Sequence, residues 1–237
     1  MGTTQTTEYI IDVAGMSVLV TRKRVKNVNM RIGPDGMARM SVPWHMSRAD
    51  AERIAREHEP WFRASLQRTE RRRSDSVRSW EDGSAALAWG KRVTVRIKDD
   101  GERRCALVGD ELVLWGASEL DATAREKLAE AWYVGALRER VEAIRPECER
   151  RVGRRATSVT LRRMKTRWGS CTSRTGRIRL NTALAECPPD CTRMVLIHEL
   201  CHLREANHGP RFHALMDLCC PDWRVTQRWL DEHPPRA

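Results

Sequence analysis

The stretch His198-Glu199-Leu200-Cys201-His202, followed by His208, indicates how this chain folds around a reactive site. Two histidines four positions apart lie about one helical turn from each other, so both imidazoles can reach one cation from the same face. A glutamate directly after the first histidine is the usual general base toward a metal-bound water. In hydrolases Zn²⁺ typically takes three protein ligands and keeps one position for water, whose pKa falls to about 7. The pattern therefore predicts a catalytic zinc site on a helix.

The flanking residues predict that this helix is buried. Met194-Val195-Leu196-Ile197 leads into the motif and Leu203 follows it, while Pro188-Pro189 ends the preceding segment. Asp190 is the candidate N-cap. Burying two histidines and a glutamate is costly unless they are paired or bound to a metal. We therefore favour a metal site over a pair of core histidines beside a salt-bridged glutamate.

A third histidine ligand requires this helix to stop. If the helix continued, His208 would lie roughly 240° around the axis from His202 and would face away from the metal. Asn207 followed by Gly209-Pro210 is a stop signal, because Asn tolerates the left-handed conformation and Pro cannot propagate a helix. We expect the chain to turn there and bring His208 back to the ion.

Other residues could take the third position or assist the reaction. His213 is the alternative ligand, followed by Glu205 or a later acid such as Asp217. His213 could instead polarise a bound carbonyl, and Arg211 is a second candidate for stabilising a developing oxyanion. Surface charge and helix packing are the more common roles for both residues.

Several motifs in order along the chain resemble those of a known family. They are Arg167-Trp168-Gly169-Ser170-Cys171, then Gly176-x-Ile178-x-Leu180-Asn181, then His198 to Leu203, then Asn207-His208 with Phe212. Together they resemble the signature of the YgjP-like metallopeptidases, small relatives of the SprT-like and other gluzincin-type proteases. The resemblance is strong over about residues 150–232 and weaker before them. It implies a zinc-dependent hydrolase with His198, His202 and His208 as ligands and Glu199 as base. One departure is His213, where the family usually has an aromatic residue.

The chain as a whole is predicted to be an α+β protein. Short β-branched segments separated by turns predict a β-rich N-terminal region over residues 1–117, with one helix that begins at Ser47. This helix is expected to end at a charged linker over Arg68 to Ser74. Residues 118–237 are predicted to be a zincin-like metallopeptidase domain with an antiparallel sheet and the metal-binding helix. The strands expected in the first region lie near residues 9–13, 16–20, 30–32, 37–42, 85–88, 93–97, 105–108 and 112–115.

The second region begins with a long amphipathic helix from about Asp121 to Arg145, which Pro146 ends or kinks. Val159 to Leu161 and Ile178 to Asn181 are predicted strands on either side of a loop over Trp168 to Cys171. Two short helices are expected over residues 210–218 and 222–231. An edge strand beside a metal helix can bind an extended substrate by adding it to the sheet, and Ile178 to Asn181 or Arg163 to Lys165 could serve.

The composition indicates the cellular compartment in which the protein is expected. The 237 residues contain no apolar run near the ~20 residues that a membrane span needs and no N-terminal apolar leader, so a cytoplasmic location without membrane contact is expected. The eight cysteines form no pair of Cys-x-x-Cys motifs, so a zinc site made of cysteines is not expected. Most are predicted to be buried thiols, and Cys171 could line the cleft.

The formal net charge of +11 is carried mainly by arginine, in clusters such as Arg22-Lys23-Arg24 and Arg71-Arg72-Arg73. A basic surface can bind phosphate backbones weakly, but no known nucleic-acid-binding motif is present.

These observations leave three classes of function. The first is a zinc metallopeptidase that cleaves peptide bonds of protein substrates by Glu-assisted attack of a zinc-bound water. The second is a metal-dependent hydrolase of a non-peptide substrate such as a nucleotide phosphoanhydride. The third is a basic nucleic-acid-associated binding protein with a structural zinc.

Overall fold

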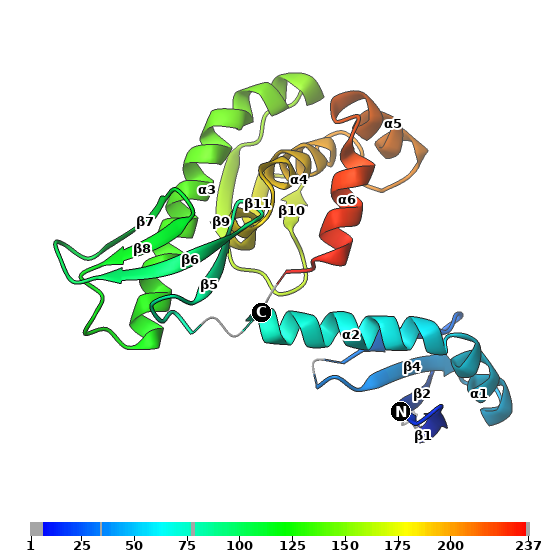
Figure 1. The fold of residues 1–237 in the computed structure, drawn as a ribbon. Helices are drawn as coiled ribbons and strands as arrows, with labels where there is room; N and C mark the ends of the chain where they lie inside the picture. The colour runs from blue at the N-terminus through cyan, green and yellow to red at the C-terminus, as the bar shows by residue number, and fades with distance from the viewer. Residues whose placement is uncertain (1–6, 34, 77–78, 236–237) are drawn as a thin grey trace, which may run out of the picture. The chain divides into compact units, whose positions relative to one another are not determined.

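The computed structural model describes residues 7–33, 35–76 and 79–235 and has the expected α+β architecture (Figure 1). The chain divides into two compact units, residues 1–77 and 78–237, each with its own hydrophobic core. This division lies earlier than the boundary expected between residues 117 and 118. Buried residues of the strands between Ala86 and Leu114 belong to the same core as the helices that follow, which explains the difference.

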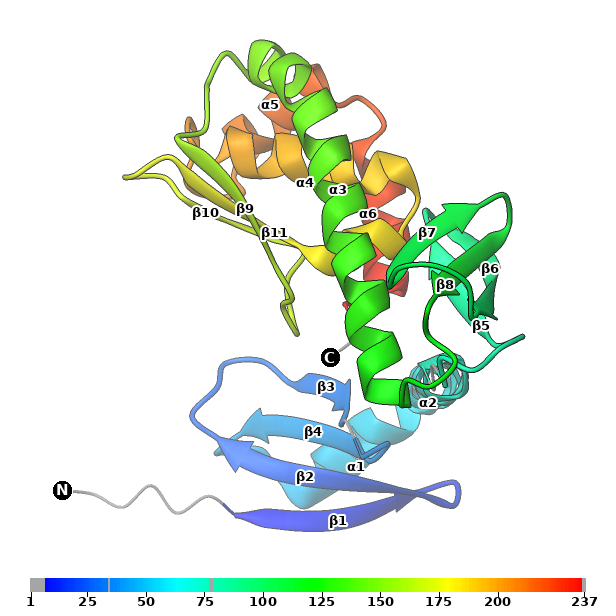
Figure 2. The same ribbon diagram turned by 90° about the vertical axis from the view of Figure 1, so that its left-hand side faces the viewer.

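The first unit is a four-stranded mixed sheet covered by two helices (Figure 2). Its strands are β1 (Glu8–Val13), β2 (Met16–Lys23), β3 (Asn29–Ile32) and β4 (Ala38–Pro43), in the order β1-β2-β4-β3. Strands β2 and β4 are parallel, and the other pairs are antiparallel. Alternate residues of the strands, such as Val18 and Met40, are fully buried against Phe62 and its neighbours.

The helix predicted to begin at Ser47 is present, but it is divided into two successive helices. Ser47 is the N-cap of α1 (Arg48–Glu57) and accepts a hydrogen bond from the backbone N–H of Asp50 at 3.0 Å. The chain then continues as α2 (Glu59–Ser76), which contains the run predicted as a linker over residues 68–74. That prediction was wrong because Arg and Glu, which make up most of this run, are good helix formers, so a polar composition does not by itself end a helix.

The second unit contains two sheets and a group of helices. The first sheet has the order β5-β6-β8-β7, and the second has the order β10-β11-β9. The strands are β5 (Ala85–Ala88), β6 (Lys91–Lys98), β7 (Arg104–Val108), β8 (Glu111–Trp115), β9 (Ser158–Arg162), β10 (Gly169–Thr172) and β11 (Arg177–Asn181). The helices are α3 (Ala122–Val152), the 3-10 helix η1 (Thr182–Glu186), α4 (Pro189–Cys201), α5 (Pro210–Cys219) and α6 (Trp223–Glu232).

Helix α4 is the centre of this unit. It packs against α3, α5, α6 and the strands β10 and β11. Met194, Leu196, Ile197 and Leu200 are buried on it, as the apolar flanks of the histidine motif predicted. Among the described residues, no helix combines the length and the apolar character needed to cross a membrane.

Helix α3 begins where the sequence predicted, with Asp121 as N-cap, but it passes through Pro146 and ends at Val152. Gly153, in the left-handed conformation (φ 70°), terminates it. Val141, Cys148 and Val152 are buried on the same core. Burial of side chains on both sides of the proline therefore offsets the hydrogen bond that Pro146 cannot donate.

The sheet beside α4 differs from the prediction in two respects. Most of the loop predicted over Trp168 to Cys171 is the edge strand β10 (Gly169–Thr172). Strand β11 pairs with β9 in parallel, so the sheet is mixed rather than antiparallel. Ile178 to Asn181 lies in the central strand β11, and Arg163 to Lys165 follows β9 outside the sheet. Neither candidate for substrate addition is the open edge beside α4; that edge is β10.

Candidate metal centre

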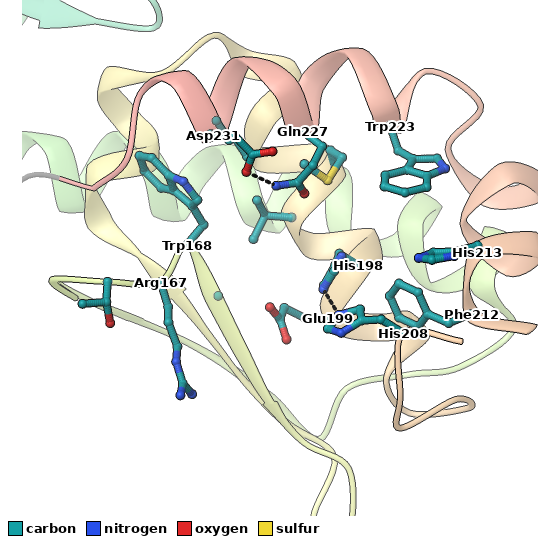
Figure 3. Close-up of a pocket in the computed structure, with 15 residues that line it drawn as sticks. Arg167, Trp168, His198, Glu199, His208, Phe212, His213, Trp223, Gln227 and Asp231 are labelled. Atoms are coloured by element: carbon teal, nitrogen blue, oxygen red, sulfur yellow. Dashed lines mark hydrogen bonds between the residues drawn. The ribbon is translucent and has the colours of Figure 1, made fainter. Parts of the chain in front are cut away.

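Three histidine side chains converge at the end of α4. One ring nitrogen of each of His198, His202 and His208 lies within 4.8 Å of those of the other two. His198 Nε2 and His208 Nε2 are 3.0 Å apart, and Figure 3 shows these two rings facing each other. Phe212 of α5 packs against all three rings, with centroid distances of 4.9, 4.7 and 4.8 Å. The cluster therefore has an apolar ring on one side and the cavities described below on another.

The return of His208 toward the other histidines was predicted correctly, but the helix ends earlier than expected. Helix α4 stops at Cys201, and His202 is its C-cap with backbone angles still in the helical region. The backbone N–H groups of Arg204 and Glu205 both donate to the carbonyl of Cys201, which forms a tight turn. His202 consequently keeps its place on the helix face while the chain behind it bends back.

The chemistry of the three donors fits a metal ion. His202 Nδ1 lies 3.1 Å from the backbone carbonyl of Glu205, so the Nδ1–H donates there and leaves Nε2 with its lone pair. Two nitrogens bound tetrahedrally to one zinc ion lie about 3.3 Å apart, close to the spacing of His198 and His208. Burial, and secondarily the neighbouring imidazoles, lowers the pKa of His198 to about 4, and burial lowers that of His202. Neutral imidazoles are the form that binds a metal.

Glu199 lies beside the histidines, in a buried site that faces a glycine of the neighbouring strand. Its side chain is buried, with a residue exposure of 5%. Burial raises the pKa of Glu199 to about 8, while the positive charge of Arg167 acts in the opposite direction. Strand β10 approaches the carboxylate through Gly169, where a Cβ atom would lie 2.4 Å from Glu199 Oε1. The absence of a side chain at position 169 thus makes room for the glutamate.

The alternative ligands lie outside the histidine cluster. Glu205 contributes its backbone carbonyl to His202, and Asp217 pairs with Arg224 and accepts a hydrogen bond from Trp223 Nε1 at 2.8 Å. His213 stacks on the Trp223 ring, with centroids 5.7 Å apart, and lines the cavity beside the cluster. Arg211 lines neither of the two cavities described below.

Two cavities meet at the cluster. The larger, of about 480 Å³, extends from the histidines toward α6, and the smaller, of about 340 Å³, extends along β10. The two share Arg167, Gly169, His198, Glu199 and His208. Cys171 lines the smaller one, as predicted. Trp223, Gln227 and Asp231 of α6 line the larger one and were not singled out from the sequence, although their spacing of four places them on one helix face.

The start of α4 is held by the turn between β5 and β6. The backbone N–H of Trp89 donates to Ala185, and that of Gly90 donates to Glu186, each at 2.9 Å. Gly90 has φ +79°, and a Cβ atom there would lie 2.7 Å from Pro188 Cγ. The first sheet of the unit thus braces the residues from which the metal-binding helix begins.

The YgjP-like metallopeptidase domain model matches residues 26–233. The chain belongs to the YgjP-like family. The match includes most of both units, so it extends well beyond the residues whose motifs carried the resemblance. Membership in this YgjP-like metallopeptidase family makes the protein a hydrolase and implies a metal ion, for which the histidine cluster is the candidate site.

One solved structure was found to be similar, the metallopeptidase zymogen of Pyrococcus abyssi abylysin. It has 20% sequence identity and a TM-score of 0.37, and the similarity covers 40% of this chain and 97% of that one. A comparison with curated proteins gave no match.

Proposed function

We propose that the protein is a zinc-dependent metallopeptidase that cleaves peptide bonds, with His198, His202 and His208 as metal ligands and Glu199 as general base. The observation that carries the proposal is the convergence of three imidazoles beside a buried carboxylate, at the junction of two cavities. Zinc is proposed over other divalent ions because three imidazole nitrogens are a typical donor set for catalytic zinc.

In the proposed reaction, the metal ion and Glu199 have separate roles. When bound, the metal ion would act as a Lewis acid toward water and the substrate carbonyl. Glu199 accepts the proton of the attacking water and then delivers it to the amine that leaves. A base with a pKa raised toward neutrality suits this exchange, because it can both take and return a proton near the working pH. Gly169 and the burial of α4 fix the carboxylate in place.

The edge strand β10 supports a peptide as the substrate. The carbonyl of Trp168 accepts the N–H of Asn181, and the pairing of the two strands alternates from there, so the N–H and C=O groups of Gly169 and Cys171 point away from β11. An extended peptide can pair with these groups beside Gly169, the residue that faces Glu199. This replaces the two segments considered from the sequence.

The test combines metal content with turnover. Purified protein is expected to contain about one zinc ion per chain by mass spectrometry of metals and to cleave members of a peptide library. Glu199→Gln should reduce turnover by about 10²–10⁴-fold with zinc content unchanged. Full activity of this zinc-loaded variant would contradict the role of Glu199. Phosphate release from nucleotides without peptide cleavage would favour the non-peptide hydrolase instead.

A further inference from the structure

The larger cavity has apolar walls and a carboxylate at the end away from the histidines. Figure 3 shows Asp231 and Gln227 on α6, across the cavity from Glu199 and His208. Trp168 lies next to Asp231 in this view, and Leu230 also lines the cavity. The cavity thus offers apolar surface and, at Asp231, a charged oxygen.

The carboxylate of Asp231 is oriented but is not neutralised by a described residue. Gln227 Nε2 donates to Asp231 Oδ1 at 2.7 Å, and among the described residues no arginine or lysine forms an ion pair with Asp231. Asp217, which accepts a hydrogen bond from Trp223 of the cavity lining, is by contrast paired with Arg224. Asp231 thus leaves a carboxylate at the cavity that no described lysine or arginine pairs with.

The cations around the cavity do not compensate Asp231. Arg167 also lines the cavity, but Figure 3 shows its side chain pointing away from Asp231. Arg224 lies over the Trp223 ring, 4.6 Å from its centroid, and its charge is already paired with Asp217. The α6 end of the cavity therefore favours a positive charge in a bound ligand.

We propose that this cavity is a subsite that selects lysine or arginine side chains of the substrate, with Asp231 as the residue that recognises the charge. The inference deepens the proposed peptidase function and rests on it. Lysine and arginine combine an apolar stem with a terminal cation, which suits a cavity lined by apolar side chains and a carboxylate. A purely apolar chain would contact the walls but leave Asp231 without a partner, and an acidic chain would be repelled by it.

Binding to the inactive variant Glu199→Gln tests the subsite without cleavage. The probes are labelled alanine-serine hexapeptides with lysine, norleucine or glutamate at each position in turn, and fluorescence anisotropy gives the Kd. At one position, lysine is expected to bind about threefold to tenfold more tightly than norleucine, and glutamate more weakly than both. Norleucine has the apolar stem without the charge, so this ratio isolates the contribution of Asp231. Raising the salt concentration should reduce the ratio, because an exposed charge pair is screened.

Substitutions at Asp231 decide the outcome. In the Glu199→Gln background, Asp231→Asn should bring the ratio close to one, and Asp231→Lys should make glutamate the preferred residue. Asp222→Asn is the matched control, because Asp222 is an exposed acid at the start of the same helix that does not line the cavity. Circular dichroism verifies that each variant is folded.

The inference is overturned if no peptide binds, if lysine and norleucine bind equally, or if the ratio survives in Asp231→Asn. These results differ from failure of the proposed function. If the zinc-loaded wild type cleaves no peptide while the variant still prefers lysine through Asp231, the subsite stands and the peptidase activity does not.

Discussion

Gly169 lies so close to Glu199 that any side chain there would collide with the proposed base. A Cβ atom would lie 2.4 Å from Oε1 and 2.8 Å from Cγ of this buried residue. Gly169→Ala is expected to lower kcat by about 10²-fold, because a small displacement of a catalytic group has a cost of that order. Gly135→Ala is the control, since a Cβ atom there meets nothing within 4 Å. Unchanged kcat in Gly169→Ala with zinc bound would contradict the placement of Glu199.

The buried carboxylate also predicts a pH effect on stability in chelator-treated protein. Burial raises the pKa of Glu199 from 4.5 to about 8. The folded state is therefore most stable below pH 4.5, where the carboxyl group is neutral, and it loses this stability as the pH rises to about 8. Between pH 5 and 9, wild type should lose up to about 4 kcal/mol of unfolding free energy relative to Glu199→Gln. Urea titrations of both proteins measure this difference. All other ionisable groups are the same in both proteins, so parallel pH curves would contradict the prediction.

At the scale of single residues, the sequence predicted much of the candidate site. The spacing of His198 and His202 placed two imidazoles together because a helical turn fixes their separation. The return of His208 was predicted from stop signals, but the end of α4 at Cys201 was not, since the turn depends on backbone bonds that no residue type signals. Asp231 was not singled out because its place at the cavity depends on which face of α6 meets the cavity.

At the scale of elements, the turn between β5 and β6 offers a test of how α4 is supported. Gly90 has φ +79° and little room beside Pro188, whereas Gly83 has φ +80° and open space around it. Both substitutions by alanine incur backbone strain of about 1 kcal/mol. Gly90→Ala is expected to destabilise the unit by about 1–3 kcal/mol more than Gly83→Ala, because Pro188 must also move. Thermal unfolding of the two variants measures the difference, and equal losses would show that the contact with Pro188 matters little.

The elements that were predicted wrongly share a physical cause. Strand β10 is four residues long and includes Gly169 and Ser170, so its local β propensity is weak and its pairing with β11 creates it. Helix α3 passes Pro146 because its buried stripe continues, and the parallel pairing of β9 with β11 joins residues distant in sequence. In each case tertiary packing outweighed local preference, which single-residue patterns do not record.

At the scale of the whole molecule, many basic groups have partners. Several arginines form ion pairs with acids one helical turn away, including Arg48 with Glu52, Arg53 with Glu57, and Arg151 with Glu147. Such pairs reduce the charge that a phosphate backbone would meet. Nucleic-acid binding stays a prediction, and loss of retention on heparin at moderate salt would contradict it.

The two units have separate cores, which predicts separate unfolding transitions. The core clusters share no residue, although the sequence alone gave a later boundary. Met40 and Leu137 are fully buried, one in each core. Met40→Ala should destabilise the first unit by about 2–5 kcal/mol and leave the second transition in place, and Leu137→Ala should do the reverse. Calorimetry of the full chain, together with a fragment of residues 78–237, measures both. Because each substitution serves as the control for the other, a single transition that shifts equally in both variants would mean that the two cores unfold as one.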